Sequence, residues 1–317
     1  MTNATVSVIL PTYERPDLLE RAIGSVLQQT YRQWQLIVVD DNEPTSASKN
    51  DTASIVSRLA TYGRIDYIQH EGNRGGAAAR NTGIKRADGE VVAFLDDDDT
   101  WHPEKLQAQI KVLAAATDSV GLIYAGVEAI DVGTGTSHVL RPTKRGSLYP
   151  DILASNFVGT TSGFLCKREL LLQVGMFDES LAAAQDYDLC IRLAEVCEFD
   201  FVDRVFIKRY KHPGTRITHN LHEKIAAFQS IYEKHRATLE EHPHIHSSFL
   251  FNKGRFEMEA ADRYAAARTF RRAWQLNPSR LGLLGHWLMA STGSTSYQAA
   301  RLATRPFRRF ARRLSKT

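Results

Sequence analysis

The sequence is poor in cysteine and contains no long apolar run. Its three cysteines, Cys166, Cys190 and Cys197, show no metal-ligand spacing and leave one unpaired in any disulfide scheme. We therefore expect reduced thiols, as in a cytoplasmic protein. No stretch of eighteen consecutive apolar residues occurs, so the sequence predicts no transmembrane helix. Residues 1–11 also lack the signal-peptide pattern of a basic region followed by an apolar stretch that ends in small residues.

Two common nucleotide-binding loops are missing as well. No Gly-x-Gly-x-x-Gly follows the first predicted strand, at residues 6–10, and no Gly-Lys-Ser/Thr loop occurs. The first absence argues against a Rossmann dinucleotide site, and the second argues against a P-loop NTPase. A nucleotide would have to be bound by other residues.

Acidic residues are absent from residues 298–317, which contain seven Arg and Lys side chains. Without these seven cations the formal net charge of +4 becomes −3. Phe307, Phe310 and Leu314 share one face of a helix in this segment. The pattern predicts a basic amphipathic tail that binds an anionic membrane surface. The alternatives are a solvated disordered tail and attraction to nucleic acid; we expect no nucleic-acid partner.

Short apolar runs alternate with helical patterns in the first part of the chain. The runs cover residues 6–10, 36–39, 65–68 and 91–95, with helical periodicity between them. This alternation predicts an α/β domain with a mostly parallel sheet and helices on both faces. Ligands bind beyond the carboxyl ends of such strands. Here those ends carry Pro11-Thr12-Tyr13, Asp40-Asp41 and Asp96-Asp97-Asp98-Asp99.

The pattern becomes wholly helical beyond Pro213-Gly214. We therefore predict three regions: an α/β domain at 1–220, a helical module at 221–297 and the tail at 298–317. Residues 247–280 of the module match the spacing of one tetratricopeptide-like helix pair. A single pair cannot bury its faces as an array does, so we expect it to pack locally instead of binding a peptide.

Four consecutive aspartates follow the strand at 91–95. Their mutual repulsion is relieved by a cation or by solvent. Mg²⁺ typically binds one or two carboxylates together with substrate phosphates, and would stabilise a leaving diphosphate. The alternative is a solvated acidic turn at the start of the helix near Pro103.

Other strand-end residues suit a nucleotide. Asp41 can accept a hydrogen bond from a base N–H, and Tyr13 can lie against the base. Residues 73–81 contain small side chains, which allow close approach of the backbone, together with Arg74 and Arg80, which can meet phosphate oxygens.

These segments together resemble the signature series of glycosyltransferase family 2. The matching segments are Val6-Ser-Val-Ile-Leu-Pro-Thr-Tyr13, Val38-Val-Asp-Asp-Asn42, Asn73-Arg-Gly-Gly-Ala-Ala-Ala-Arg-Asn-Thr-Gly83, Phe94-Leu-Asp-Asp-Asp-Asp-Thr-Trp101, Gly175-Met-Phe-Asp178 and Gln185-Asp-Tyr-Asp-Leu-Cys-Ile-Arg-Leu193. Each motif alone is weak, but their order and distances across residues 5–215 are specific. The resemblance implies the GT-A fold, a nucleotide-sugar donor, Mg²⁺ or Mn²⁺, and inversion at the anomeric carbon.

The resemblance also implies roles for individual residues. The nucleoside pocket corresponds to Pro11, Thr12, Tyr13 and Asp41, and Arg80 lies in the segment that closes over it. Asp96 and Asp98 match the outer positions of the family's Asp-x-Asp motif, with Asp98 as the direct metal ligand. Because all four positions are Asp, the register of the motif is ambiguous, and Asp97 can take the place of Asp96 in it; Asp96 and Asp97 are also expected to contact the donor. Asp186 matches the proposed catalytic base.

The predicted activity is transfer of a sugar, with inversion, from a nucleotide diphosphate sugar, expected to be UDP-linked. The expected acceptor is a hydroxyl of a polyprenyl-phosphate-linked or cell-surface glycan in polysaccharide biosynthesis, and the expected location is the inner face of the cell membrane. Cys190 stands where relatives often have Trp, which leaves the acceptor open. The alternatives are a nucleotidyltransferase, whose Gly-rich basic loop is missing, and a non-catalytic helical scaffold.

Overall fold

The computed structural model describes residues 4–211 and 220–292. The chain divides into two compact units, one of Met1–Ile152 with Asn156–Thr215 and the other of Leu153–Ser155 with Arg216–Thr317. The predicted tail at 298–317 lies outside the described residues. Each unit is considered by itself.

The first unit contains the predicted parallel strands. They are β1 (Val6–Thr12), β2 (Trp34–Asp40), β3 (Ile65–Gln69) and β4 (Val91–Phe94), in the spatial order β3-β2-β1-β4. Val6 of β1 is in register with Trp34 on one side and Val91 on the other. Since all four strands run in one direction, their carboxyl ends meet at one edge, as predicted.

Beyond β4 the sheet continues with both antiparallel and parallel pairs. The added strands are β5 (Asp99–Trp101), β6 (Val120–Asp131), β7 (Ser137–Leu140), β8 (Leu165–Lys167) and β9 (Glu198–Lys211). β8 pairs antiparallel with β4 and β6, β6 pairs parallel with β9, and β5 pairs antiparallel with β9. β6 and β7 pair antiparallel, with Val127 opposite Leu140. The sheet is therefore mixed, and β5 is a strand that the sequence pattern did not predict.

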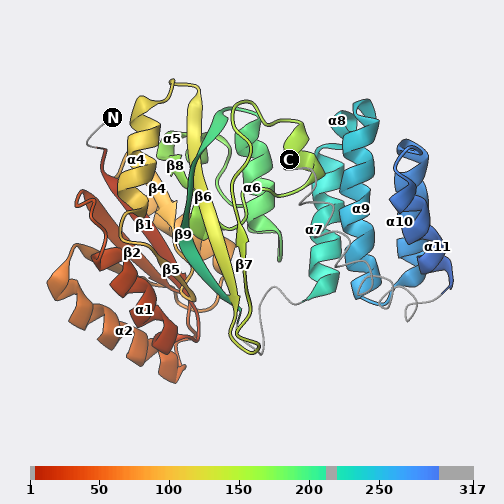
Figure 1. Cartoon of the computed structure of the whole chain (residues 1–317). Coiled ribbons are helices and arrows are strands. Elements are labelled where there is room, and N and C mark those ends of the chain that lie inside the picture. Colours follow the sequence, from red (N-terminus) through yellow and green to blue (C-terminus); the bar gives the residue numbers. More distant parts are fainter. Residues whose placement is uncertain (1–3, 212–219, 293–317) are drawn as a thin grey trace. The chain divides into compact units, whose positions relative to one another are not determined.

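Helices pack beside this sheet in the described part of the first unit (Figure 1). They are α1 (Pro16–Leu27), α2 (Ala47–Leu59), α3 (Gly76–Arg86), α4 (Lys105–Ala115), α5 (Arg168–Gln173) and α6 (Gln185–Ala194), with 3₁₀ turns at η1 (Ala60–Tyr62), η2 (Asp151–Ala154) and η3 (Thr161–Gly163). α1 starts at Pro16, whose fixed φ suits a first helical position. α3 lies so close to β1 that a Cβ on Gly83 would lie 2.4 Å from the Ile9 side chain.

The core of the first unit joins the inner faces of the strands to the buried stripes of α1 and α4. It includes Val8, Leu10, Ile23, Leu36 and Leu106, all fully buried. Buried apolar surface of this kind is the main stabilising contribution to such a domain. One lysine is fully buried in the first unit as well: Lys105 Nζ lies 3.8 Å from the centre of the Trp101 ring.

The second unit is helical. Its helices are α7 (Leu221–Lys234), α8 (Arg236–Glu241), α9 (Pro243–Glu259), α10 (Arg263–Leu276) and α11 (Leu281–Thr292). Figure 1 shows α9, α10 and α11 side by side, and α9 with α10 covers the predicted helix pair at 247–280. A Cβ on Gly254 would lie 2.7 Å from the Phe270 ring, so these two helices pack closely. Within 4–211 and 220–292, no helix is both long and apolar enough to span a bilayer.

Candidate active site

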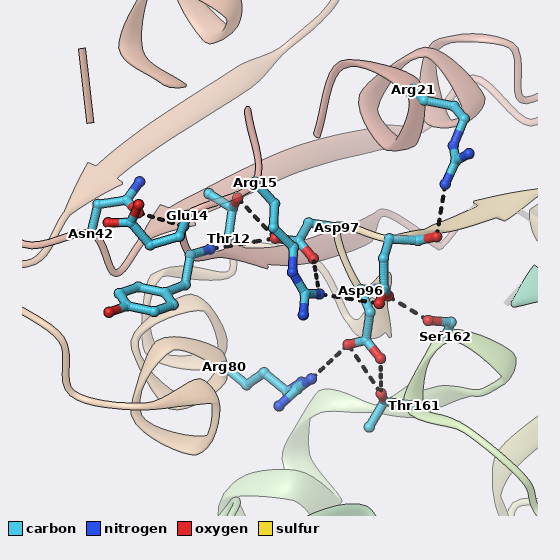
Figure 2. Close-up of polar contacts among 12 residues, drawn as sticks. Thr12, Glu14, Arg15, Arg21, Asn42, Arg80, Asp96, Asp97, Thr161 and Ser162 are labelled. Carbon is cyan, nitrogen blue, oxygen red and sulfur yellow. Dashed lines mark hydrogen bonds and ion pairs between the residues drawn. The ribbon is translucent and has the colours of Figure 1, made fainter. Parts of the chain in front are cut away.

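The strand ends of β1, β2 and β4 place the predicted site residues along one edge of the sheet. Pro11 and Thr12 are the last residues of β1, Asp41 follows β2, and Asp96 lies two residues beyond β4. The turn after β4 closes with a hydrogen bond from Asp99 N to the carbonyl of Asp96, at 3.0 Å. Figure 2 shows Thr12, Arg15, Arg80, Asp96 and Asp97 together at this edge.

Asp97 is directed toward the end of β1. Its Oδ2 accepts hydrogen bonds from Thr12 Oγ1 at 3.0 Å and from Tyr13 N at 3.4 Å, and its Oδ1 accepts one from Arg15 Nη1 at 3.2 Å. Burial raises the pKa of Asp97 to about 7, although Arg15 opposes the shift. Asp97 thereby connects the predicted nucleoside segment to the acidic turn.

Asp98 is held from two sides. Arg15 Nη1 lies 3.1 Å from Asp98 Oδ2, so that one guanidinium bridges Asp97 and Asp98. Arg21 Nη2 donates to the carbonyl of Asp98 at 2.9 Å, and its guanidinium lies 4.0 Å from the centre of the Tyr210 ring. Both arginines come from the start of the chain, so α1 and the turn before it position this carboxylate.

Asp96 contacts residues from α3 and η3. Arg80 Nη2 donates to Asp96 Oδ1 at 2.6 Å, and Thr161 Oγ1 lies 3.3 Å from both carboxylate oxygens. Ser162 Oγ accepts from Asp96 N at 3.1 Å. Arg80, predicted to close over the nucleoside, thus lies against a predicted metal ligand in this structure (Figure 2).

Asp99 completes an acidic trio with Asp96 and Asp98. One carboxylate oxygen from each of the three lies within 4.8 Å of the others. Asp99 is fully buried, and neither of its carboxylate oxygens has a hydrogen-bond partner among the described residues. Burial, reinforced by Asp96 and Asp98, raises its pKa well above the usual value, although the Ser162 hydroxyl and the charge of Arg209 oppose the shift. A cluster of carboxylate oxygens at this spacing fits a hard divalent cation, which takes oxygen ligands.

Asp41 is buried beside the loop that precedes α3. It accepts hydrogen bonds from Arg74 N at 2.9 Å and Gly75 N at 2.8 Å, and His70 Nδ1 lies 2.7 Å from its Oδ1. Gly75 has φ = 88°, a left-handed conformation that favours glycine. Asp41 therefore fixes the loop at 73–75 next to the predicted nucleoside pocket, and its contact with a base stays a prediction.

Asp186 is the second residue of α6. Its Oδ1 accepts a hydrogen bond from Tyr187 N at 2.8 Å. Burial raises its pKa, while the Tyr187 amide and Arg80 oppose the shift and Asp96 adds to it. The charges of Arg80 and Asp96 act on Asp186, so the predicted base belongs to the same electrostatic cluster as the acidic trio. Its catalytic role stays a prediction.

Known proteins match this chain over the same region. The profile described as "Glycosyl transferase family 2" matches residues 7–174. The chain belongs to glycosyl transferase family 2. An uncharacterized glycosyltransferase of Rickettsia prowazekii is 34% identical over 215 residues, or 65% of this chain and 64% of the relative. The amylovoran biosynthesis glycosyltransferase AmsB of Erwinia amylovora is 34% identical over 209 residues, or 64% of this chain and 67% of AmsB.

Solved structures confirm the GT-A-like fold of this family 2 member. S. aureus TarS 1–349 superposes with a TM-score of 0.64 at 16% identity, covering 94% of this chain and 92% of the TarS 1–349 chain. The mannosyltransferase PcManGT of Pyrobaculum calidifontis, solved with GDP-Man and Mn²⁺, gives 0.57 at 21% identity, covering 97% and 83%. The predicted α/β fold with a helical C-terminal part is confirmed.

Several residues of this family 2 site were not predicted from the sequence. Asp99 and Arg15 are described above. Asn81 of α3 is a third: its Nδ2 donates to Phe177 O at 2.9 Å and to Glu179 Oε1 at 2.8 Å, and its Oδ1 accepts from Phe177 N at 2.9 Å. Asn81 thus fastens the segment that contains Asp178 to α3. Nothing in the local sequence signals contacts made 96 and 98 residues away.

Proposed function

We propose that the chain transfers a sugar, with inversion, from a nucleotide diphosphate sugar to a glycan hydroxyl. The observation that carries this proposal is the trio of Asp96, Asp98 and Asp99 at the strand ends. Membership of family 2 favours glycosyl transfer over the nucleotidyltransferase and scaffold alternatives.

The trio would hold Mg²⁺ or Mn²⁺, with Asp98 and Asp96 as the ligands predicted from sequence and Asp99 added by its position. A divalent ion there supplies charge stabilisation for the departing diphosphate. The mannosyltransferase solved with Mn²⁺ supports this assignment. Asp97 is proposed to order the nucleoside pocket instead of binding the metal. It accepts hydrogen bonds from Thr12 Oγ1 and Tyr13 N at the end of β1, where the nucleoside is expected.

The proposed base is Asp186. It accepts the proton of the acceptor hydroxyl while the hydroxyl oxygen attacks the anomeric carbon and the bond to the diphosphate breaks. A pKa raised by burial makes its carboxylate a stronger base than an ordinary aspartate. Pro11, Tyr13 and Asp41 orient the nucleoside in this proposal, and Arg80 can exchange Asp96 for a phosphate oxygen.

The donor is proposed to be UDP-linked and the acceptor a polyprenyl-phosphate-linked or cell-surface glycan. TarS has been solved with UDP-GlcNAc, and AmsB is named for amylovoran biosynthesis; both support this choice. We also propose that the enzyme works at the inner face of the cell membrane, held on anionic lipid by residues 298–317. Such an acceptor would be presented at that surface.

The test is a panel of UDP-, GDP- and dTDP-sugars, assayed for donor hydrolysis and transfer with Mg²⁺, with Mn²⁺ and in excess EDTA. We expect turnover with one base class only, and none in EDTA. The anomeric configuration of the product, read by NMR, should be inverted. Full activity in EDTA would disprove the metal assignment, and retention would disprove direct displacement.

Two variants assign the roles. Asp98→Ala should abolish metal-dependent nucleotide binding in calorimetry. Asp186→Asn should keep donor binding and lower the transfer rate by about two to four orders of magnitude. The matched control is Asp203→Asn, an exposed aspartate of β9 whose side chain is 69% accessible. If Asp186→Asn instead lost donor affinity and kept its rate, Asp186 would be a binding residue.

A further inference from the structure

The charge asymmetry of the chain extends beyond the predicted tail into described helices. Residues 263–317 contain twelve Arg and Lys side chains and no Asp or Glu. The formal charge of residues 1–262 is therefore −8, against +4 for the whole chain. Five of these cations, all arginines, lie in the described part, in or between α10 and α11.

α10 buries one face and exposes its arginines. Ala266, Phe270 and Ala273 are fully buried, and Ala266 and Phe270 pack against Met258 and Ala290 of the neighbouring helices. Arg268 and Arg271 are exposed on the outer side of the helix. Neither α10 nor α11 contains a carboxylate to balance them.

α11 is apolar on a face that it does not bury. It packs through Leu283 and Ala290, which are each 1% exposed. Leu281, Leu284 and Leu288 have the spacing of one stripe on the opposite side. Leu281 is 72% exposed and Leu288 is 52% exposed. A row of large aliphatic side chains exposed to water costs free energy unless a lipid bilayer or another molecule covers it.

A tryptophan pair packs between the two helices next to Arg271. Trp274 of α10 and Trp287 of α11 are stacked, with ring centres 5.8 Å apart and an interplanar angle of 19°. Both rings are partly buried, and the Arg271 guanidinium lies 5.7 Å from the centre of the Trp287 ring. Helices that combine leucines, tryptophans and arginines in this way have the composition of helices that lie in a membrane interface.

We propose that α10 and α11 form a folded surface that docks on an anionic lipid bilayer. In this proposal Leu281, Leu284 and Leu288 enter the apolar boundary, and Arg268 and Arg271 contact the anionic head groups. Charge complementarity selects the lipid as the occupant, because a face with arginines and no acid matches an anionic surface and would repel a second copy of itself. The chain continues from α11 into residues with seven more cations and no acid.

This inference deepens the proposed membrane location and adds a second, folded contact to the proposed tail. It does not depend on the donor, the metal or Asp186. The two contacts can therefore be tested apart, and a failure of the proposed enzymatic function leaves the vesicle assay unaffected.

The experiment is co-sedimentation of the full chain with phosphatidylcholine vesicles, with and without about one-third phosphatidylglycerol. The apolar variant is Leu281→Ser with Leu288→Ser, and its control is Leu172→Ser, an exposed leucine of α5 that is 42% accessible. The charge variant is Arg268→Gln with Arg271→Gln, and its control is Arg58→Gln with Arg64→Gln in the first unit. Circular dichroism checks that each variant is folded.

We expect the full chain to bind anionic vesicles only. Each basic residue at an anionic surface contributes about fivefold, so the charge variant should bind about thirtyfold more weakly. The apolar variant should lose at least tenfold, and both controls should bind like the unmodified chain. A chain truncated after residue 297 should still bind, and the apolar pair of changes in that truncation should abolish the binding.

Three results would overturn the inference. In the first, both surface variants bind vesicles like the unmodified chain, but truncation after residue 297 abolishes the binding. The tail would then be the anchor. Another is equal binding to neutral and anionic vesicles. In the third, the apolar variant binds vesicles as before but changes its sedimentation velocity. This would show that a second copy covers α11.

Discussion

Replacing Asn81 by Ala tests how firmly the segment at 175–180 is fastened. The change removes three hydrogen bonds, of 2.9, 2.8 and 2.9 Å, and leaves the buried N–H and C=O of Phe177 without their partner. Each lost bond costs about 1 kcal/mol net, so local opening should become easier by about 3 kcal/mol. That corresponds to about a hundredfold in the opening equilibrium.

Hydrogen exchange of the Phe177 amide is the direct assay, because this amide donates to Asn81. We expect its exchange to accelerate about a hundredfold in Asn81→Ala, and the transfer rate to fall because the segment leads into α6 and Asp186. Asn81→Asp should behave no better, since a carboxylate would face Phe177 O and Glu179. The control, Glu179→Gln, keeps an acceptor for Asn81 and should change exchange by less than about fivefold.

An unchanged exchange rate for Phe177 in Asn81→Ala would refute this reasoning. It would mean that α6 and the core hold the segment without the side-chain bridge. A faster exchange with undiminished transfer would instead show that the segment is fastened by Asn81 but plays no part in the reaction.

Two further predictions concern stability. Burial lowers the pKa of Lys105 well below its usual value. At pH values between this lowered pKa and the ordinary lysine pKa, the unfolded chain binds more protons than the folded chain, so stability should rise with pH there by about 1.4 kcal/mol per pH unit. Lys105→Met should raise the free energy of unfolding by about 1–4 kcal/mol at pH values below this window and flatten the slope, and an unchanged pH profile in urea titrations would contradict it. Gly83→Ala should cost about 1–3 kcal/mol because its Cβ meets Ile9, whereas Gly24→Ala in α1, with nothing within 4 Å, should gain about 0.5–1 kcal/mol. Equal midpoints in thermal unfolding for these two glycine variants would show that α3 moves away from β1 freely.

The parallel half of the fold was predictable because it depends on local patterns. Each of β1 to β4 is a short apolar run that ends at a polar residue, and parallel pairing then brings these ends together. This is why the sequence pattern alone groups Thr12, Asp41 and Asp96. The mixed half depends on pairings such as β5 with β9, which join segments more than a hundred residues apart and leave no local signal.

The roles within the acidic run could not be separated from the sequence. Four identical residues give no alternation, so the directions of Asp97 and Asp99 depend on the turn and on β5. The structure turns Asp97 toward Thr12 and brings Asp99 to Asp96 and Asp98. Arg15 was missed for a similar reason, because an arginine before a proline-initiated helix resembles any solvated residue until its two carboxylate partners are placed.

The pairing of β5 with β9 has a consequence for the order in which this enzyme is made. Domains fold from the N-terminal side as the ribosome releases them. Strands β1 to β4 can assemble once about the first hundred residues have emerged, and the nucleoside edge can form with them. Asp99, however, is placed by β5, whose partner ends at Lys211. A nascent chain therefore carries an open edge at β4 and an incomplete acidic trio until β8 and β9 arrive, so the proposed metal site is complete only when most of the first unit has been synthesised.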